Sequence, residues 1–181
     1  MNFHKRTFWI ILITSVTSLL LLACSKDGDI EPQEVVIPKT IQGIDANVIS
    51  KYPRLADLAN IAIALEKYKQ DHRSYPLSSG SDTEWFKKNW DSAIDDSGEL
   101  KSEWINGLAP KYLPYLPVDP RRDGLQWHQY IYKSDGANYK LVVLNPEDCF
   151  AVKQEAPDFI DLRRGECKSY GFWTPRAVRW R

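Results

Sequence analysis

Few side chains in this sequence could carry out acid–base, nucleophilic or metal chemistry. The chain has three histidines, and only His72 and His128 lie beyond the amino-terminal 23 residues. No Gly-x-Ser-x-Gly, no His-Glu-x-x-His and no pairing of a cysteine with a nearby histidine is present. We therefore expect no enzymatic activity, no catalytic residue and no cofactor. His72 is predicted to be a solvated histidine at a helix end, and His128 a hydrogen-bonded structural one.

Acidic residues in one stretch superficially suggest calcium binding: Asp91, Asp95, Asp96 and Glu99. An EF-hand loop needs oxygen ligands at alternate positions and a glycine at the sixth. Counting from Asp91, the third position is Ala93 and the sixth is Asp96, so the pattern fails. We predict a solvated loop here and no metal site.

The amino-terminal residues predict export. His4, Lys5 and Arg6 precede an apolar run from Thr7 to Leu22. The run has about 16 residues, fewer than the roughly 20 of a membrane-spanning helix. The ending Leu21-Leu22-Ala23-Cys24 resembles the lipobox of bacterial lipoproteins, in which the signal is cut before the cysteine and that cysteine is acylated. The resemblance implies a signal peptide at 1–23 and a lipidated Cys24; the alternative is an uncleaved anchor in which Cys24 has no role.

The residues after Cys24 are predicted to be a tether, at 24–43, because they are polar and proline-containing and show little periodicity. Lys5 and Arg6 leave with the signal, so 22 of the 24 basic side chains face 24 acidic ones, a formal net charge of −2. This balance argues against a nucleic-acid partner. In lipoproteins an Asp after the lipidated Cys tends to retain the protein in the inner membrane, so Ser25 implies the outer membrane.

Two further cysteines, Cys149 and Cys167, remain once Cys24 is assigned to lipid. In an exported chain such a pair is predicted to form a disulfide. The closed loop would have about 19 residues and would add on the order of 3 kcal/mol to stability. A reactive or metal-bound pair is the alternative.

The main predicted element is an amphipathic helix in residues 55–76. Its apolar positions follow helical spacing: Leu55, Leu58, Ala59, Ala62, Leu65 and Tyr68. We expect the helix to begin near Ser50, with that side chain as its cap, and to end before Tyr75-Pro76. Downstream, Leu125–Lys133 and Asn138–Leu144 flank a turn and predict an antiparallel hairpin with one face available to the helix. Residues 44–181 are thus predicted to form one α+β domain.

The order of these features resembles the type IV pilin-like fold, and most closely the soluble part of the major (G-type) pseudopilin of type II secretion. Ala64-Leu65-Glu66-Lys67-Tyr68 followed by Tyr75-Pro76 is similar to the end of that family's helix. The segment from Tyr112 to Pro120, YLPYLPVDP, matches its Tyr-Leu-x-x-Leu-Pro-x-Asp-Pro motif. The resemblance covers residues 55–145 and implies one long helix packed on a small antiparallel sheet.

Departures from the family bear on function. Prepilins carry Phe-Thr-Leu-Ile-Glu at the start of an apolar stem, and this chain has a lipobox and a polar tether instead. We therefore do not expect it to enter a filament as an ordinary subunit. The family's calcium loop is replaced by Leu144-Asn145-Pro146-Glu147-Asp148, where Glu147 and Asp148 could offer oxygens, but no bound calcium is predicted. A Cys149–Cys167 closure resembles the carboxy-terminal disulfide loop of many type IV pilins.

The leading hypothesis is a non-catalytic, membrane-anchored pseudopilin-like lipoprotein that binds or scaffolds envelope proteins of a secretion or pilus system. The alternative is a lipoprotein that binds surface polysaccharide, since the mature chain is rich in tryptophan and flat aromatic rings can stack on sugars. The tail from Tyr170 to Arg181 is aromatic and basic, and is interpreted as a sheet edge or a contact surface. Its candidate contact residues for a partner or glycan are Trp173, Arg176 and Trp180.

Overall fold

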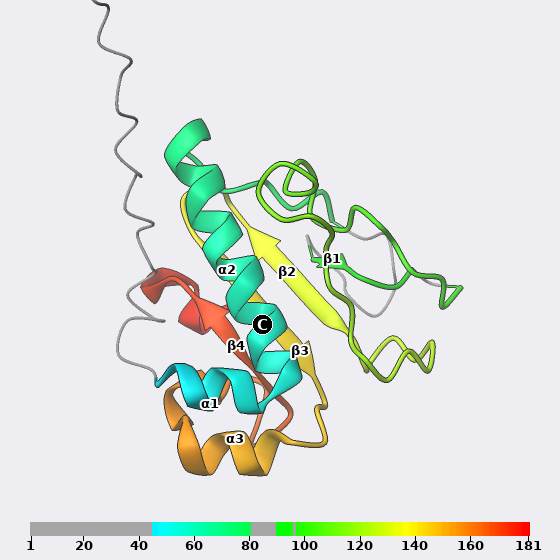
Figure 1. Ribbon diagram of the computed structural model, residues 1–181, viewed down its shortest axis with the longest axis vertical. Helices are drawn as coiled ribbons and strands as arrows, with labels where there is room; N and C mark the ends of the chain where they lie inside the picture. Colours follow the sequence, from blue (N-terminus) through cyan, green and yellow to red (C-terminus); the bar gives the residue numbers. More distant parts are fainter. Residues whose placement is uncertain (1–44, 81–89, 96) are drawn as a thin grey trace, which may run out of the picture. The chain divides into compact units, whose positions relative to one another are not determined.

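Helix α2 (Pro53–His72) packs on one face of a four-stranded antiparallel sheet in the computed structural model, which describes residues 45–80, 90–95 and 97–181 (Figure 1). The other described elements are α1 (Ala46–Lys51), β1 (Asp91–Ser92), β2 (Tyr130–Ser134), β3 (Tyr139–Leu144), α3 (Cys149–Glu155), the 3-10 helix η1 (Pro157–Phe159), β4 (Ser169–Trp173) and the 3-10 helix η2 (Pro175–Arg179). The predicted α+β class is confirmed. The predicted signal peptide (1–23) and the tether with Cys24 (24–43) lie outside the described residues.

Proline decides where α2 begins. The prediction of a start at Ser50 is wrong, because Ser50 belongs to the separate helix α1 and α2 starts at Pro53. Tyr52, between the two helices, is extended (φ −114°, ψ 105°), which is the conformation that a following proline favours. Pro53 takes the first helical position, where its missing N–H costs no hydrogen bond. The cap belongs to α1 instead, where Asp45 accepts a hydrogen bond from the Asn47 N–H at 2.9 Å.

The end of α2 is fixed against the hairpin. Arg73 leaves the helix with a left-handed φ of 64°. The Tyr75 N–H then donates to the carbonyl of Gly136 at 2.8 Å, and the Pro76 carbonyl accepts from the Tyr132 hydroxyl at 2.7 Å. The Tyr-Pro pair is therefore anchored to the turn and the middle of the sheet.

The strand order is β1-β2-β3-β4, with every neighbouring pair antiparallel. In the predicted hairpin Tyr130 pairs with Val143 and Ser134 with Tyr139, and Gly136 supplies a φ of 85° in the turn. The hairpin is confirmed, although β2 begins at Tyr130 rather than at Leu125. The tail contributes β4, which adds an edge to the sheet as one of its two interpretations expected.

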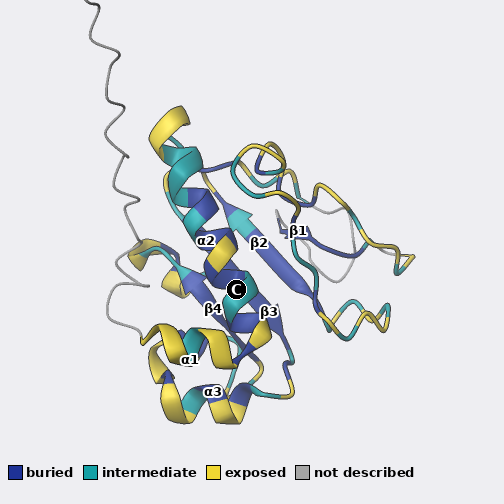
Figure 2. Ribbon diagram, viewed as in Figure 1, coloured by how far each residue is buried: buried dark blue, intermediate teal, exposed yellow. Residues whose placement is uncertain are grey.

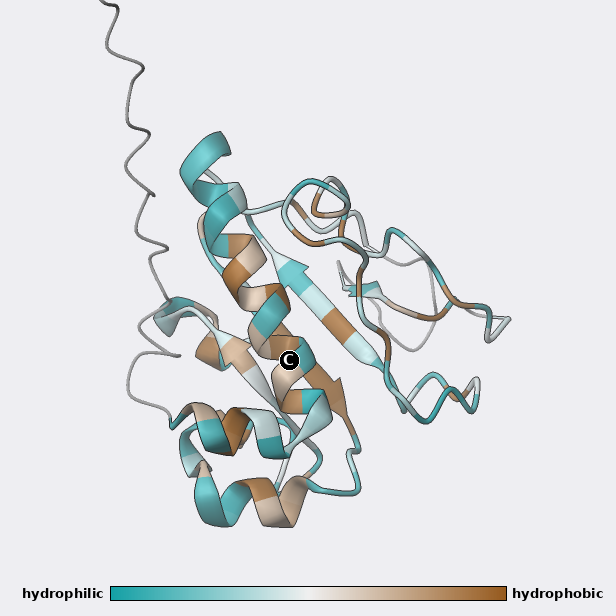
Figure 3. Cartoon of the chain, viewed as in Figure 1, coloured by the Kyte–Doolittle hydropathy of each residue, from teal (hydrophilic) through white to brown (hydrophobic). Residues whose placement is uncertain are grey.

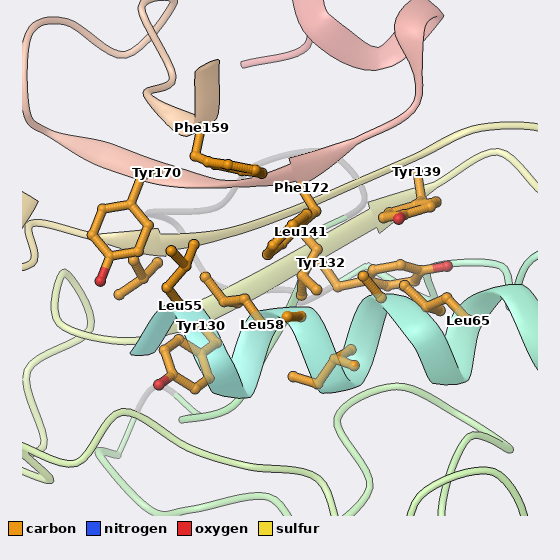
Figure 4. Close-up of a cluster of buried hydrophobic side chains, with 14 of the residues drawn as sticks. Leu55, Leu58, Leu65, Tyr130, Tyr132, Tyr139, Leu141, Phe159, Tyr170 and Phe172 are labelled. Atoms are coloured by element: carbon orange, nitrogen blue, oxygen red, sulfur yellow. The ribbon is translucent and has the colours of Figure 1, made fainter. Parts of the chain in front are cut away.

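Alternate residues of each strand face opposite sides of the sheet. The first face, together with α2, forms the larger core, whose main members are Leu55, Leu58, Leu65, Tyr130, Tyr132, Tyr139, Leu141, Tyr170 and Phe172 (Figure 4). The second face has its own buried cluster of Trp90, Ile131, Val142 and Leu144, with Trp173 packed against it. All six residues of β3 are buried, so both faces of the sheet are covered.

The last turn of α2 faces solvent, whereas its earlier turns are buried. Residues 70–72 are exposed (Figure 2) and hydrophilic (Figure 3), whereas Leu55, Leu58 and Leu65 are completely buried. Burying each leucine is worth roughly 1.5–3 kcal/mol, so these contacts hold α2 on the sheet. Across residues 45–80, 90–95 and 97–181, the structure has no helix with both the length and the apolar character needed to span a membrane.

Candidate functional site

The two histidines lie apart, each beside one polar partner. His72, the last residue of α2, places Nε2 3.0 Å from the Tyr112 hydroxyl at an exposed position. His128 precedes β2 in a turn, rather than within the strand, and its Nδ1 lies 2.6 Å from Asp123 Oδ2. The hydrogen bond from His128 lowers the pKa of the Asp123 carboxyl below its usual value.

A buried carboxylate joins the start of α2 to the proline-rich segment. Asp119 accepts hydrogen bonds from Arg54 Nε at 3.0 Å and Nη2 at 3.2 Å, and from the Arg121 N–H at 2.9 Å. Burial raises the pKa of the Asp119 carboxyl, but the hydrogen bonds from Arg54 and Arg121 outweigh burial and hold that pKa below its usual value. Arg121 also donates to the carbonyls of Leu144 at 3.2 Å and Asn145 at 3.0 Å. Three distant segments therefore meet at Asp119.

The segment from Leu144 to Asp148, compared above with the calcium loop of pseudopilins, is held by the same two arginines. Glu147 Oε2 lies 2.9 Å from Arg54 Nη2, and its Oε1 lies 3.6 Å from Arg121 Nε. Asp148 Oδ1 accepts from the Tyr170 hydroxyl at 2.9 Å. These carboxylates face guanidinium and hydroxyl donors. Within the described part of the chain, no group of three or more His, Cys, Asp or Glu side chains is placed to hold a metal ion.

Cys149 and Cys167 are both free thiols in this structure. Cys149, at the start of α3, is buried, and Cys167, before β4, is half-buried. Burial and a hydrogen bond with Cys167 raise the pKa of the Cys149 thiol far above its usual value. The two side chains are therefore neighbours, and a raised pKa disfavours the thiolate that a reactive cysteine needs. The disulfide stays a prediction.

Among the described residues, the most buried ion pair lies on the second face of the sheet, under the tail. Lys140 of β3 is fully buried, and its Nζ lies 2.8 Å from Asp161 Oδ2, whose residue is 2% exposed. Lys140 Nζ also donates to the backbone carbonyl of Trp180 at 2.7 Å. Burial lowers the pKa of Lys140, and the bond to Asp161 opposes that shift. The lysine thus ties the middle of the sheet to the tail and to the segment after η1.

The predicted contact residues of the tail are only partly available to a partner. Trp173 and Trp180 are half-buried, and Arg176, in η2, is exposed. Lys140 Nζ lies 5.2 Å from the Trp173 ring centroid, and Lys133 Nζ lies 5.7 Å from that of Trp180. The two tryptophans therefore cover lysines of the second face in addition to facing solvent.

Sequence reasoning missed Lys140 and Asp161. Strand alternation indicates only that the Lys140 side chain points away from the helix. No local pattern connects it to Asp161, since the two residues meet through the fold.

Comparison of the chain with protein-family models, with curated proteins and with solved structures found no match.

Proposed function

We propose that this chain is a non-catalytic, lipid-anchored protein of the bacterial cell envelope, with a pilin-like domain that binds or scaffolds partner proteins of a type II secretion or type IV pilus system. Acylated Cys24 would hold it to the outer membrane, and the segment up to residue 43 would act as the tether. Several buried acyl chains, at about 0.8 kcal/mol per CH₂, make such an anchor effectively permanent.

The observation that supports the pilin-like part is that the two matching motifs are each bonded to a distant part of the domain. Asp119, from the Leu-Pro-x-Asp-Pro match, binds Arg54 in the first turn of α2. The Tyr75-Pro76 match at the other end of α2 is bonded to Tyr132 and Gly136 of the hairpin. Motifs that are far apart in sequence thus support one helix-on-sheet unit, as the resemblance implies.

A role beside a filament, rather than inside one, is supported by the way α2 packs within its own domain. Its apolar residues Leu55, Leu58 and Leu65 are completely buried in the domain's own core. A short helix, α1, precedes it instead of a continuous apolar stem. The helix therefore has no apolar face left over among these residues to pack against other subunits.

A non-catalytic role is supported by how the polar groups are engaged. Buried Asp119 and Asp161 are each bound by cationic side chains, and the two histidines lie in separate places. General acid–base catalysis needs such groups aimed at a common point in a cleft.

Labelling with a fatty-acid analogue tests the anchor. The wild-type chain should incorporate label and fractionate with the outer membrane, and Cys24→Ala should lose both properties while keeping its fold. Crosslinking in intact cells should then recover secretion or pilus components. Absence of label in the wild type would refute the anchor, and unaltered secretion and piliation after deletion would refute the proposed partners.

A second candidate function is binding of surface polysaccharide, favoured by the surroundings of Trp127. This residue is 44% exposed, and its ring centroid lies 6.2 Å from that of His128. Asp123, the partner of His128, lines an open pocket of about 420 Å³ together with Glu99 and Arg122. An exposed flat ring beside several hydrogen-bonding side chains can stack on a sugar and orient it.

Retention on immobilised envelope polysaccharide tests this candidate. Wild-type protein should be retained and Trp127→Ala should not, whereas Tyr115→Ala, at an exposed aromatic residue away from the pocket lining, should behave as wild type. Equal retention of all three proteins would exclude a site at Trp127.

A further inference from the structure

Basic side chains gather on the second face of the sheet, opposite α2. Arg164 lies with its guanidinium carbon 4.9 Å from the Trp90 ring centroid, and Lys133 Nζ lies 5.6 Å from the same centroid. Arg181 Nε donates to the Arg163 carbonyl at 3.1 Å, and the Arg181 carbonyl accepts from Trp90 Nε1 at 3.1 Å. We call these four cationic residues, with Trp180, the basic face.

Residues 162–181 supply most of the basic face, and in them basic side chains outnumber acidic ones. Asp161 beneath the face is a single carboxylate shared by two cations, with Lys140 Nζ at 2.8 Å and Arg164 Nε at 3.4 Å. In residues 162–181 the single acidic side chain is Glu166, which is paired with Lys153 of α3, whereas Arg176 and Arg179 add two exposed cations. Residues 162–181 thus carry a surplus of positive charge in a chain whose formal net charge is zero.

Exposed aliphatic residues lie directly beside these cations. Leu162 is 74% exposed and precedes Arg163, and Val178 is 42% exposed and lies between Arg176 and Arg181. Trp180 is half-buried, with its ring near Lys133. Arginines that match phosphate geometry, an amphipathic tryptophan and isolated aliphatic side chains together are typical of protein surfaces that rest at a lipid–water interface.

We propose that the basic face, with Leu162 and Val178, lies against the anionic phospholipid headgroups of the membrane that holds acylated Cys24. This inference rests on the lipid anchor of the proposed function. The proposed tether has about 20 residues, and a random coil of that length would have a root-mean-square span of roughly 25 Å. Such a tether holds the domain at an effective concentration in the millimolar range, so a weak headgroup contact is well populated.

Fluorescence quenching tests which side of the domain touches lipid. The acylated full chain is placed in vesicles whose lipids are brominated near the headgroup, made either of phosphatidylcholine alone or of phosphatidylcholine with phosphatidylglycerol. Tryptophan quenching should be stronger on the anionic vesicles and should fall as NaCl is raised, because salt screens the attraction. Trp180→Phe should remove most of the difference between the two vesicle types, and Trp127→Phe should leave it unchanged.

Charge variants give an independent readout. Replacing one exposed arginine, in Arg163→Gln or Arg179→Gln, should weaken the headgroup contact by about fivefold. Lys67→Gln, on the helix that covers the opposite face, is the matched control and should have no effect. Equal quenching on both vesicle types, or a difference that follows Trp127 instead of Trp180, would overturn the proposal. The acyl mass on Cys24 is measured on the same sample, so failure of the anchor is distinguished from failure of the basic face.

Discussion

Lys140 of β3 holds its ammonium group 2.8 Å from the carboxylate of Asp161, and both residues are almost completely buried. The same ammonium group donates to the carbonyl of Trp180. One side chain therefore connects the centre of the sheet with the segment after η1 and with the tail.

Removing one member of the Lys140–Asp161 pair should strongly destabilise the protein. Asp161→Ala leaves the Lys140 ammonium buried without its counter-charge, and we expect a loss of about 3–5 kcal/mol in the free energy of unfolding, measured with urea. The double variant Lys140→Met/Asp161→Leu should be closer to wild type, because the fully buried ammonium is removed together with its counter-charge and only the partly exposed Arg164, 3.4 Å from Asp161, loses its partner. Glu166→Ala, which breaks the exposed pair with Lys153, should change little. If Asp161→Ala and Glu166→Ala lowered the free energy of unfolding equally, the buried pair would contribute no more to stability than the exposed one.

Alkaline pH should destabilise the protein through its buried tyrosines. Burial, and then the nearby Asp57 carboxylate, raise the pKa of Tyr130 far above its ordinary value of 10.0, and burial with Asp148 does the same for Tyr170. Above pH 10 the unfolded chain loses these protons and the folded chain keeps them, so stability falls by about 1.4 kcal/mol per pH unit for each tyrosine.

Urea unfolding from pH 8 to 11 measures how steeply the free energy of unfolding falls with pH. Tyr130→Phe and Tyr170→Phe should each make that slope shallower, and Tyr115→Phe, at an exposed ring, should not. Lys140 acts in the opposite sense, since its lowered pKa makes stability rise with pH up to 10.5, and the tyrosine variants leave that contribution in place. A slope that no buried tyrosine alters would contradict this assignment.

Gly171 of β4 should tolerate no side chain. A Cβ built there would lie 2.1 Å from the carbonyl oxygen of Leu141 and 2.7 Å from the Cα of Val142, both on the neighbouring strand. Gly171→Ala must therefore push β4 away from β3, and we expect a cost of about 3 kcal/mol or more in thermal or urea unfolding. Gly107→Ala, whose Cβ would meet only the Tyr68 ring at 3.5 Å, should cost about 1–2 kcal/mol from its positive φ alone. A larger loss of stability in Gly107→Ala than in Gly171→Ala would contradict the close approach of the strands at Gly171.

Oxidation should join Cys149 to Cys167 in the exported protein. Intact mass and thiol titration of material isolated from the envelope should show no reactive thiol at either position. Reduction should then lower the free energy of unfolding by about 3 kcal/mol. Cys149→Ser should remove this dependence on reductant. Two titratable thiols in the isolated protein would show that the pair remains reduced.

Local sequence accounts for much of the fold. The spacing of Leu55, Leu58 and Leu65 predicts the face of α2 that the core buries, and the turn around Gly136 predicts the central hairpin. These features could be read because each depends on residues within a few positions of one another. The start of α2 was misplaced because Pro53 acts on the residue before it, and so separates α1 from α2.

The sequence by itself determined the α+β class, the face of α2 that the core buries and the central hairpin. Only the tertiary structure decided that Asp119 binds Arg54, that Lys140 is buried against Asp161, and that Arg164 and Arg181 lie beside Trp90. The physical reason is the range of the interactions. Periodicity and turn chemistry act between near neighbours, whereas buried charge pairs and surface charge join residues that only the folded chain brings together.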